Sequence, residues 1–302
     1  MNSLYFRCIT SALTPFLFIL GHSAYGQSPT TVTATIEVDL ARFTANQHVN
    51  KYYPEFEWRN VDHMVLHDID GTVKAYTFVF AESHNEFRSS EDLQRHIQEK
   101  AAQLREAQEK VANAAPEAQA EGQTNASVVE AEENLYNFNN LATVITGATN
   151  DSKLILRHFR GLPSFWADAE MLDADTSVRL YGKSLQVSRV IMITPMDFRL
   201  IAFEGNKRAE TASDVRNAEK ATIPDSAYVL SAHGKKPEKM SVVRKARQSI
   251  ETRKQQRLKT LEPAERARYE KAQQDRAKAL ANEWRQYREL WIKSQDENEG
   301  TR

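Results

Sequence analysis

The chain has 302 residues, of which 41% are hydrophobic and 27% charged, which is enough apolar material for a globular core beside solvated helices. A mean hydropathy of -0.60 excludes a bundle of membrane helices. The formal charge of -1 conceals two unequal halves: residues 27–234 hold 20 Lys and Arg against 30 Asp and Glu, and residues 235–293 hold 18 against 8. Such a basic end is either drawn to anionic surfaces or solvated along charge-rich helices.

Residues 1–26 have the pattern of a secretory signal peptide. Arg7 charges the first part, an apolar run covers Cys8 to Leu20, and Ala24-Tyr25-Gly26 offers small residues for cleavage. The run is shorter than the roughly 18 residues that span a bilayer, which favours cleavage over a retained anchor. We therefore expect an exported protein, periplasmic or secreted. Because Cys8 is the only cysteine, the mature chain from Gln27 onward is expected to have no thiol or disulfide.

The first elements predicted after the leader are a helix and a hairpin. Apolar residues at helical spacing predict a helix over residues 38–49. Two runs rich in β-branched and aromatic residues, 61–69 and 72–80, predict strands. Asp70-Gly71 between them is typical of a two-residue hairpin turn.

A helical insertion is expected at about residues 89–140. Ser90 can cap a helix that continues to residue 111 with apolar residues on one face. A loop rich in Ala, Gln and Glu follows at 114–126, and a second helix is expected at 127–137.

Strand character returns after the insertion. Strands are predicted at 142–147, 153–159, 187–194 and 197–204, with a helix at 164–180. Pro195 lies in a tight connection between the last two strands. Hairpins that alternate with helices indicate an α+β domain over residues 27–210, an antiparallel sheet with helices on one face.

The last part of the chain is expected to be a linker and a charged tail. Residues 211–238 are polar and predict the linker, and residues 239–298 predict a basic helical tail. Pro263 either kinks one helix or begins a second one as its first residue. Near the end of this tail, four apolar residues recur at intervals of four, three and four positions, which predicts an apolar seam on one side of the helix. Its members, candidates for partner binding, are Leu280, Trp284, Tyr287 and Trp291. The seam can form a short coiled coil, dock on a partner or dock on the protein's own body.

Two stretches resemble a known family. Asp68-Ile69-Asp70-Gly71 followed by Ala75-Tyr76-Thr77-Phe78 is similar to the hairpin of streptopain-type propeptides and their stand-alone inhibitor relatives. Thr143 to Ala148 and Gly161-Leu162-Pro163 resemble segments that follow in related exported proteins. The resemblance covers roughly half of the chain. It implies the family's fold, and packing against a papain-like cysteine peptidase that masks the peptidase site or assists its folding.

The sequence predicts no catalytic, cofactor-binding or metal-binding residue. His63 and His67 share one face of a strand ~13 Å apart, so ordinary structural roles are favoured over metal binding. Asp68 to Gly71 does not match a calcium loop, because Thr77 stands where a bidentate Glu is required. Neither a glycine-rich nucleotide loop nor a common hydrolase motif occurs.

The function expected from these observations is that of an exported, non-catalytic binding protein with a propeptide- or inhibitor-like body. Its expected partner is a protein, for which the resemblance suggests a cysteine peptidase. The first alternative is a structural protein of the cell envelope, whose basic tail binds anionic polymers or mediates self-association. The second is an enzyme of unrecognised type. No sequence-specific contact with nucleic acid is expected, because the tail offers charge alone.

Overall fold

The structure is a computed structural model that describes residues 34–84, 86–113, 128–131, 133, 137–172, 174–204, 223–231 and 236–299. All of them belong to one compact unit that spans Thr33–Arg302. The predicted leader at 1–26 and the predicted loop at 114–126 lie outside the described residues. In the predicted second helix of the insertion, residues 128–131 and 133 are described and are helical.

The elements agree closely with those predicted from residue patterns. The strands are β1 (Trp58–His67), β2 (Val73–Glu82), β3 (Leu141–Gly147), β4 (Ile155–Arg160), β5 (Leu185–Thr194), β6 (Asp197–Glu204), β7 (Tyr228–Ser231) and β8 (Glu238–Lys239). The helices are α1 (Val38–Tyr52), α2 (Ser90–Asn113), α5 (Ser164–Met171), α6 (Ala174–Tyr181), α8 (Met240–Lys259) and α9 (Pro263–Glu299).

The strands form one eight-stranded sheet in the order β4-β3-β2-β1-β5-β6-β7-β8. Its two halves are antiparallel meanders, β1 to β4 and β5 to β8. A short parallel pairing joins the halves, where Leu66 lies opposite Val190. The predicted α+β class is confirmed.

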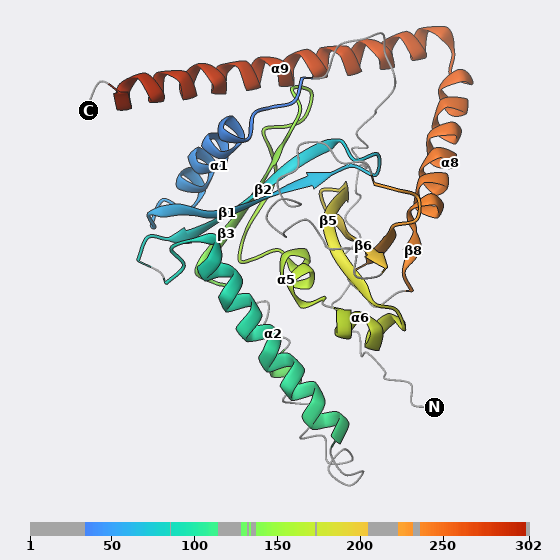
Figure 1. Ribbon diagram of the computed structural model, residues 1–302. Coiled ribbons are helices and arrows are strands. Elements are labelled where there is room, and N and C mark those ends of the chain that lie inside the picture. The colour runs from blue at the N-terminus through green and yellow to red at the C-terminus, as the bar shows by residue number, and fades with distance from the viewer. Residues whose placement is uncertain are drawn as a thin grey trace. The chain divides into compact units, whose positions relative to one another are not determined.

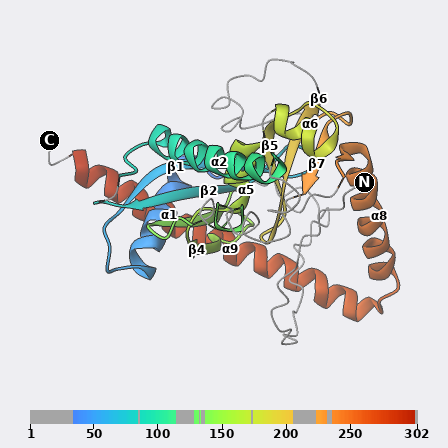
Figure 2. The same cartoon turned by 90° about the horizontal axis from the view of Figure 1, so that it is seen from below.

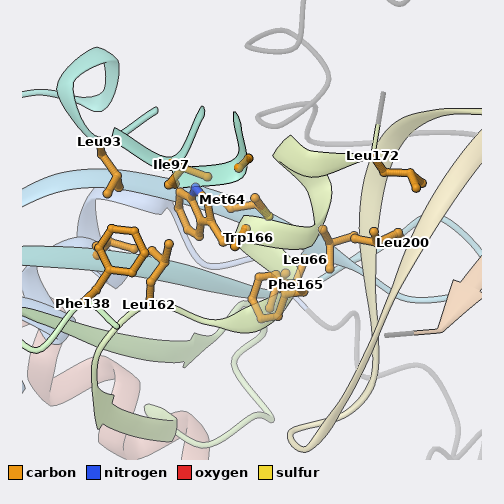
Figure 3. Close-up of a cluster of buried hydrophobic side chains, with 14 of the residues drawn as sticks. Met64, Leu66, Leu93, Ile97, Phe138, Leu162, Phe165, Trp166, Leu172 and Leu200 are labelled. Atoms are coloured by element: carbon orange, nitrogen blue, oxygen red, sulfur yellow. The ribbon is translucent and has the colours of Figure 1, made fainter. Parts of the chain in front are cut away.

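The helices pack on both faces of the sheet, which corrects the prediction of one covered face (Figure 1). On one face, α2 and α5 pack against the sheet (Figure 2), and Trp166 of α5 lies beside Ile97 and Met64 (Figure 3). Phe165 of α5 also meets Phe198 of β6, with ring centres 4.5 Å apart. On the other face lie α1 and part of α9. The reason is visible in β2, whose even and odd positions are almost all buried. Such a nearly continuous apolar strand needs cover on both sides.

The hairpin between β1 and β2 is longer than the predicted two-residue turn. The Asp68 N–H donates to the Thr72 carbonyl at 2.8 Å, and the Gly71 N–H donates to the Asp68 carbonyl at 2.9 Å. Ile69 and Asp70 are therefore the central turn residues. Gly71 follows them at φ 87°, in the left-handed region that glycine enters without strain.

Two further predictions meet a different result, and one is confirmed. The helix expected at 164–180 is divided into α5 and α6, because Leu172 leaves the helical conformation and packs into the core. The linker expected at 211–238 contains β7 and the first residue of β8. β7 pairs with β6 in the sheet and buries the side chains of Val229 and Leu230. In the tail, α8 ends at Lys259 and α9 begins at Pro263, which confirms the second of the two readings of that proline.

The helices in the described part of the chain differ from membrane-spanning helices. None of them combines the length with the apolar character that crossing a bilayer demands.

Candidate functional site

The second half of α9 docks on the protein's own body. Trp284 is only 2% exposed and packs among residues of α1 and of the sheet. Its indole N–H donates to the Ser152 carbonyl at 2.9 Å, in the connection between β3 and β4. Tyr287 and Trp291 pack partly buried against the same cluster.

The predicted seam thus has its apolar partner within this chain. Trp284, Tyr287 and Trp291 share the interface with α1, whereas Leu280, one turn earlier, is half-exposed. Trp284 is too deeply buried to contact another molecule while α9 stays docked. Trp291 remains partly accessible and contributes to a groove.

The groove lies between α1, the start of β1 and the end of α9, and has a volume of about 550 Å³. Aromatic rings, amide groups and two guanidinium groups line it. The lining residues are Asp39, Arg42, Phe43, Asn46, Trp58, Arg59, Asn60, Trp291 and Gln295. Flat apolar rings beside a few fixed polar groups are the composition typical of ligand-binding sites.

The β1 wall of the groove is held by hydrogen bonds to the backbone. The Trp58 indole donates to the Tyr53 carbonyl at 3.0 Å, and the Arg59 guanidinium donates to the Phe87 carbonyl at 2.8 Å. The Asn60 amide bonds two carbonyls, those of Asp62 and Val79, at 3.0 Å each. These side chains are therefore oriented before any ligand arrives, which lowers the entropy cost of binding.

The charge of the groove favours an anionic ligand. Arg42 pairs with Asp39 at 2.6 Å, so these two charges compensate each other. Arg59 bonds a neutral carbonyl, and it forms no ion pair within the described part of the chain. One of its NH2 groups is engaged with Phe87 and its Nε is buried, so its contribution to binding is a positive charge that attracts a carboxylate or a phosphate.

A second cluster lies on the opposite flank of α1, against β4. The His48 ring centre is 4.2 Å from that of Tyr52 and 4.7 Å from that of His158. Nearby, the Arg160 guanidinium lies 4.8 Å from the Trp58 ring centre and 4.9 Å from that of Phe56. Arg160 also forms an ion pair with Glu82 at 2.7 Å. The cluster joins the end of α1 to the edge of the sheet.

This second cluster predicts a loss of stability in acid. Burial, assisted by His158 and Lys51, lowers the pKa of His48 from 6.5 to about 4. As pH falls from 6.5 to 4, His48 becomes protonated in the unfolded chain but stays neutral in the folded chain. The free energy of unfolding should therefore fall across this window and be unaffected by His48 above it. The slope should lie below the limit of about 1.4 kcal/mol per pH unit, because solvent reaches part of the ring and screens its charge.

Denaturant unfolding between pH 7 and pH 4 measures this effect as a difference between variants. His48→Phe keeps a ring against Tyr52 and should remove the slope that His48 contributes. His84→Gln changes an exposed histidine and should keep it. Equal slopes in wild type and His48→Phe would contradict the assignment.

The Asp68 to Gly71 motif anchors α8. Arg247 donates to both carboxylate oxygens of Asp68, at 2.8 and 3.2 Å, and Lys74 lies 3.5 Å from the same carboxylate. Arg244 donates to the Ile69 carbonyl at 3.0 Å. Burial lowers the pKa of Lys74, partly opposed by Asp68. The segment that carries the family resemblance therefore has a clear structural role, the attachment of a helix.

The two histidines considered for metal binding lie in different surroundings. The His63 ring stacks on Phe78 at 6.1 Å, and His67 is fully buried. Within the described ranges, His, Asp and Glu side chains form no group of three that is placed to hold a metal ion.

The positive charge of the tail is concentrated on α8. This helix contains seven Lys and Arg and one Glu, whereas α9 contains eight basic and eight acidic residues. Arg244 and Arg247 are engaged with the body. The exposed basic residues are Lys245, Arg253, Arg257 and Lys259.

Comparison with known proteins does not place this chain in a family. Neither a family model, nor a curated protein, nor a solved structure matches the chain.

Sequence reasoning found one residue of the groove, Trp291, and missed the others. Arg42, Asn46, Arg59 and Asn60 belong to elements whose apolar pattern was recognised, and their polar side chains carried no separate signal. They converge only because α9 returns to α1.

Proposed function

We propose that this chain is an exported, non-catalytic binding protein. The observation that carries the proposal is the groove between α1, β1 and α9, which aromatic rings, amides and two arginines line. Its ligand is a carboxylate-bearing segment of a partner protein, which the aromatic rings and Arg59 can hold together. The resemblance to streptopain-type propeptides supports a papain-like cysteine peptidase as that partner.

The test is capture of the partner from the exported fraction of the producing cells, with the full chain as bait. Trp291→Ala and Arg59→Gln should each weaken the interaction by roughly tenfold or more, the loss expected when one central contact is removed. Leu290→Ala is the matched control, because Leu290 neighbours Trp291 on α9 and is 52% exposed. Isothermal titration of the captured protein then measures each affinity. A partner that binds all three variants equally would contradict the groove assignment.

A peptidase assay separates the family proposal from the general one. If the partner is a papain-like peptidase, the wild-type chain should change its activity or its refolding yield, and Arg59→Gln should do so less. A partner without peptidase activity that depends on Arg59 would keep the binding function and exclude the peptidase.

A second function is favoured by the charge on α8, namely binding of an anionic envelope polymer. Four basic residues along this helix are exposed, and their attraction to phosphate must weaken as the salt concentration rises. Lipopolysaccharide and polyphosphate are suitable probes. Changing Lys245, Arg253 and Arg257 to Gln should remove most of the affinity, and binding that survives about 1 M salt would contradict this function.

A further inference from the structure

The edge strand β4 is a second surface with unused binding capacity. It is the outermost strand of the sheet and pairs, within the described part of the chain, with β3 alone. All its residues are half-exposed. The opposite edge, β8, has only two residues and continues directly into α8. A free edge presents unpaired N–H and C=O groups that can accept another strand.

The ladder indicates which backbone groups are free. The Gly161 N–H donates to the Leu141 carbonyl at 2.7 Å, so this opposed pair is hydrogen-bonded. In an antiparallel ladder every second opposed pair is hydrogen-bonded. The backbone groups of Phe159 and Arg157 therefore also form their hydrogen bonds with β3. The backbone groups of His158 and Arg160 therefore turn toward the free edge.

The side chains of β4 restrict what can bind there. The strand, Ile-Leu-Arg-His-Phe-Arg, has two arginines and a histidine and no acidic residue. Arg157 lies 4.9 Å from the Phe159 ring centre. On the α1 side, Tyr52 is 53% and Phe56 37% exposed beside this strand, which offers apolar area to an added chain.

These features point to an acidic partner strand in place of a second copy. Self-pairing of β4 would place two copies of Arg157 on one face and two copies of His158 and Arg160 on the other, and like charges on facing strands are destabilising. An extended segment that alternates Asp or Glu with apolar residues can place its carboxylates on the face of Arg157, which has no ion pair within the described part of the chain, whereas Arg160 already pairs with Glu82. We propose that the free edge of β4 binds an extended acidic segment of a partner protein and adds it to the sheet as a further strand.

This site uses the backbone edge of β4, which the groove does not include, although Trp58 lines the groove and also lies 4.8 Å from Arg160. Variants that spare Trp58 can therefore test each site without the other. The probe is a short end-blocked peptide that alternates Glu with Val and Thr, labelled for fluorescence anisotropy against the full chain. The same peptide with Lys in place of Glu is its charge control. We expect the Glu peptide to bind and the Lys peptide not to bind.

Three variants locate the binding. His158→Pro removes an N–H that faces the free edge and spares the bonds to β3, so it should weaken binding roughly tenfold. Arg157→Glu should weaken it at least as much by reversing the charge. Arg59→Gln, in the groove, should leave it unchanged. If His158→Pro does not fold, Arg157→Glu and hydrogen exchange of the His158 and Arg160 amides, slowed by the peptide, decide the matter.

Several results would overturn the proposal. These are absence of peptide binding, equal binding of the Glu and Lys peptides, and no response to either β4 substitution. Sedimentation that shows a dimer dispersed by Arg157→Glu would assign the edge to a second copy, against the acidic partner.

Discussion

Replacing Trp284 by alanine should lower the free energy of unfolding by about 3–5 kcal/mol, the range observed when a large buried aromatic side chain is truncated. The indole is almost fully buried between α9 and the α1 face of the sheet. Its removal leaves a cavity there and deprives the Ser152 carbonyl of its donor. The half of α9 that carries Tyr287 and Trp291 should detach as a result. Denaturant unfolding and the fluorescence of Trp291 measure these two effects.

Two further substitutions separate the contributions of Trp284. Trp284→Phe retains most of the apolar contact and loses the hydrogen bond, so it should cost about 1–3 kcal/mol. Leu290→Ala lies on the exposed side of the same helix and should change stability by less than about 0.5 kcal/mol. An α9 that stays docked in Trp284→Ala, with unchanged stability, would show that the helix is held by other contacts.

The second large effect is expected for Asp68→Asn. Its carboxylate meets Arg247 and Lys74, and the side chains of Asp68 and Lys74 are only 13% and 12% exposed. A neutral amide cannot balance these two cations, so Lys74 would remain buried without its counter-charge. We expect a loss of about 2–3 kcal/mol, less than for a fully buried pair because Arg247 is 38% exposed. Hydrogen exchange should also show earlier opening of α8.

Asp70→Asn is the matched control. Asp70 lies in the same loop, is exposed, and accepts its hydrogen bonds from Thr72. Its substitution should cost less than about 1 kcal/mol and leave the exchange of α8 unchanged. Equal losses in the two variants would mean that the loop, and not the ion pair, fixes α8.

Much of the fold could be predicted because its elements carry strong local patterns. The strand predicted at 197–204 coincides with β6, and the helix predicted at 38–49 is α1 without its last turn. Local patterns do not report tertiary contacts. The division between α5 and α6 depends on Leu172 packing into the core, and the short β7 strand is stabilised by burial against β6.

The candidate site was predictable only in part, for the same reason. The spacing of Trp284, Tyr287 and Trp291 indicated a buried seam, and periodicity says nothing about what buries it. The partner proved to be α1 and the Ser152 carbonyl, 132 residues away in sequence. Arg59 and Asn60 become recognisable as groove residues only when α9 brings Trp291 to them.

The attachment of the tail at two places makes the docking of α9 an intramolecular association. Arg247 fixes α8 at one place and Trp284 fixes α9 at the other, and residues 263–268 at the start of α9 are exposed. A detached end therefore rebinds at an effective concentration on the order of millimolar. A single proteolytic cut in the exposed turns of α9 would abolish this advantage and turn docking into a bimolecular reaction. The groove, one wall of which is Trp291, should then open at nanomolar protein concentrations.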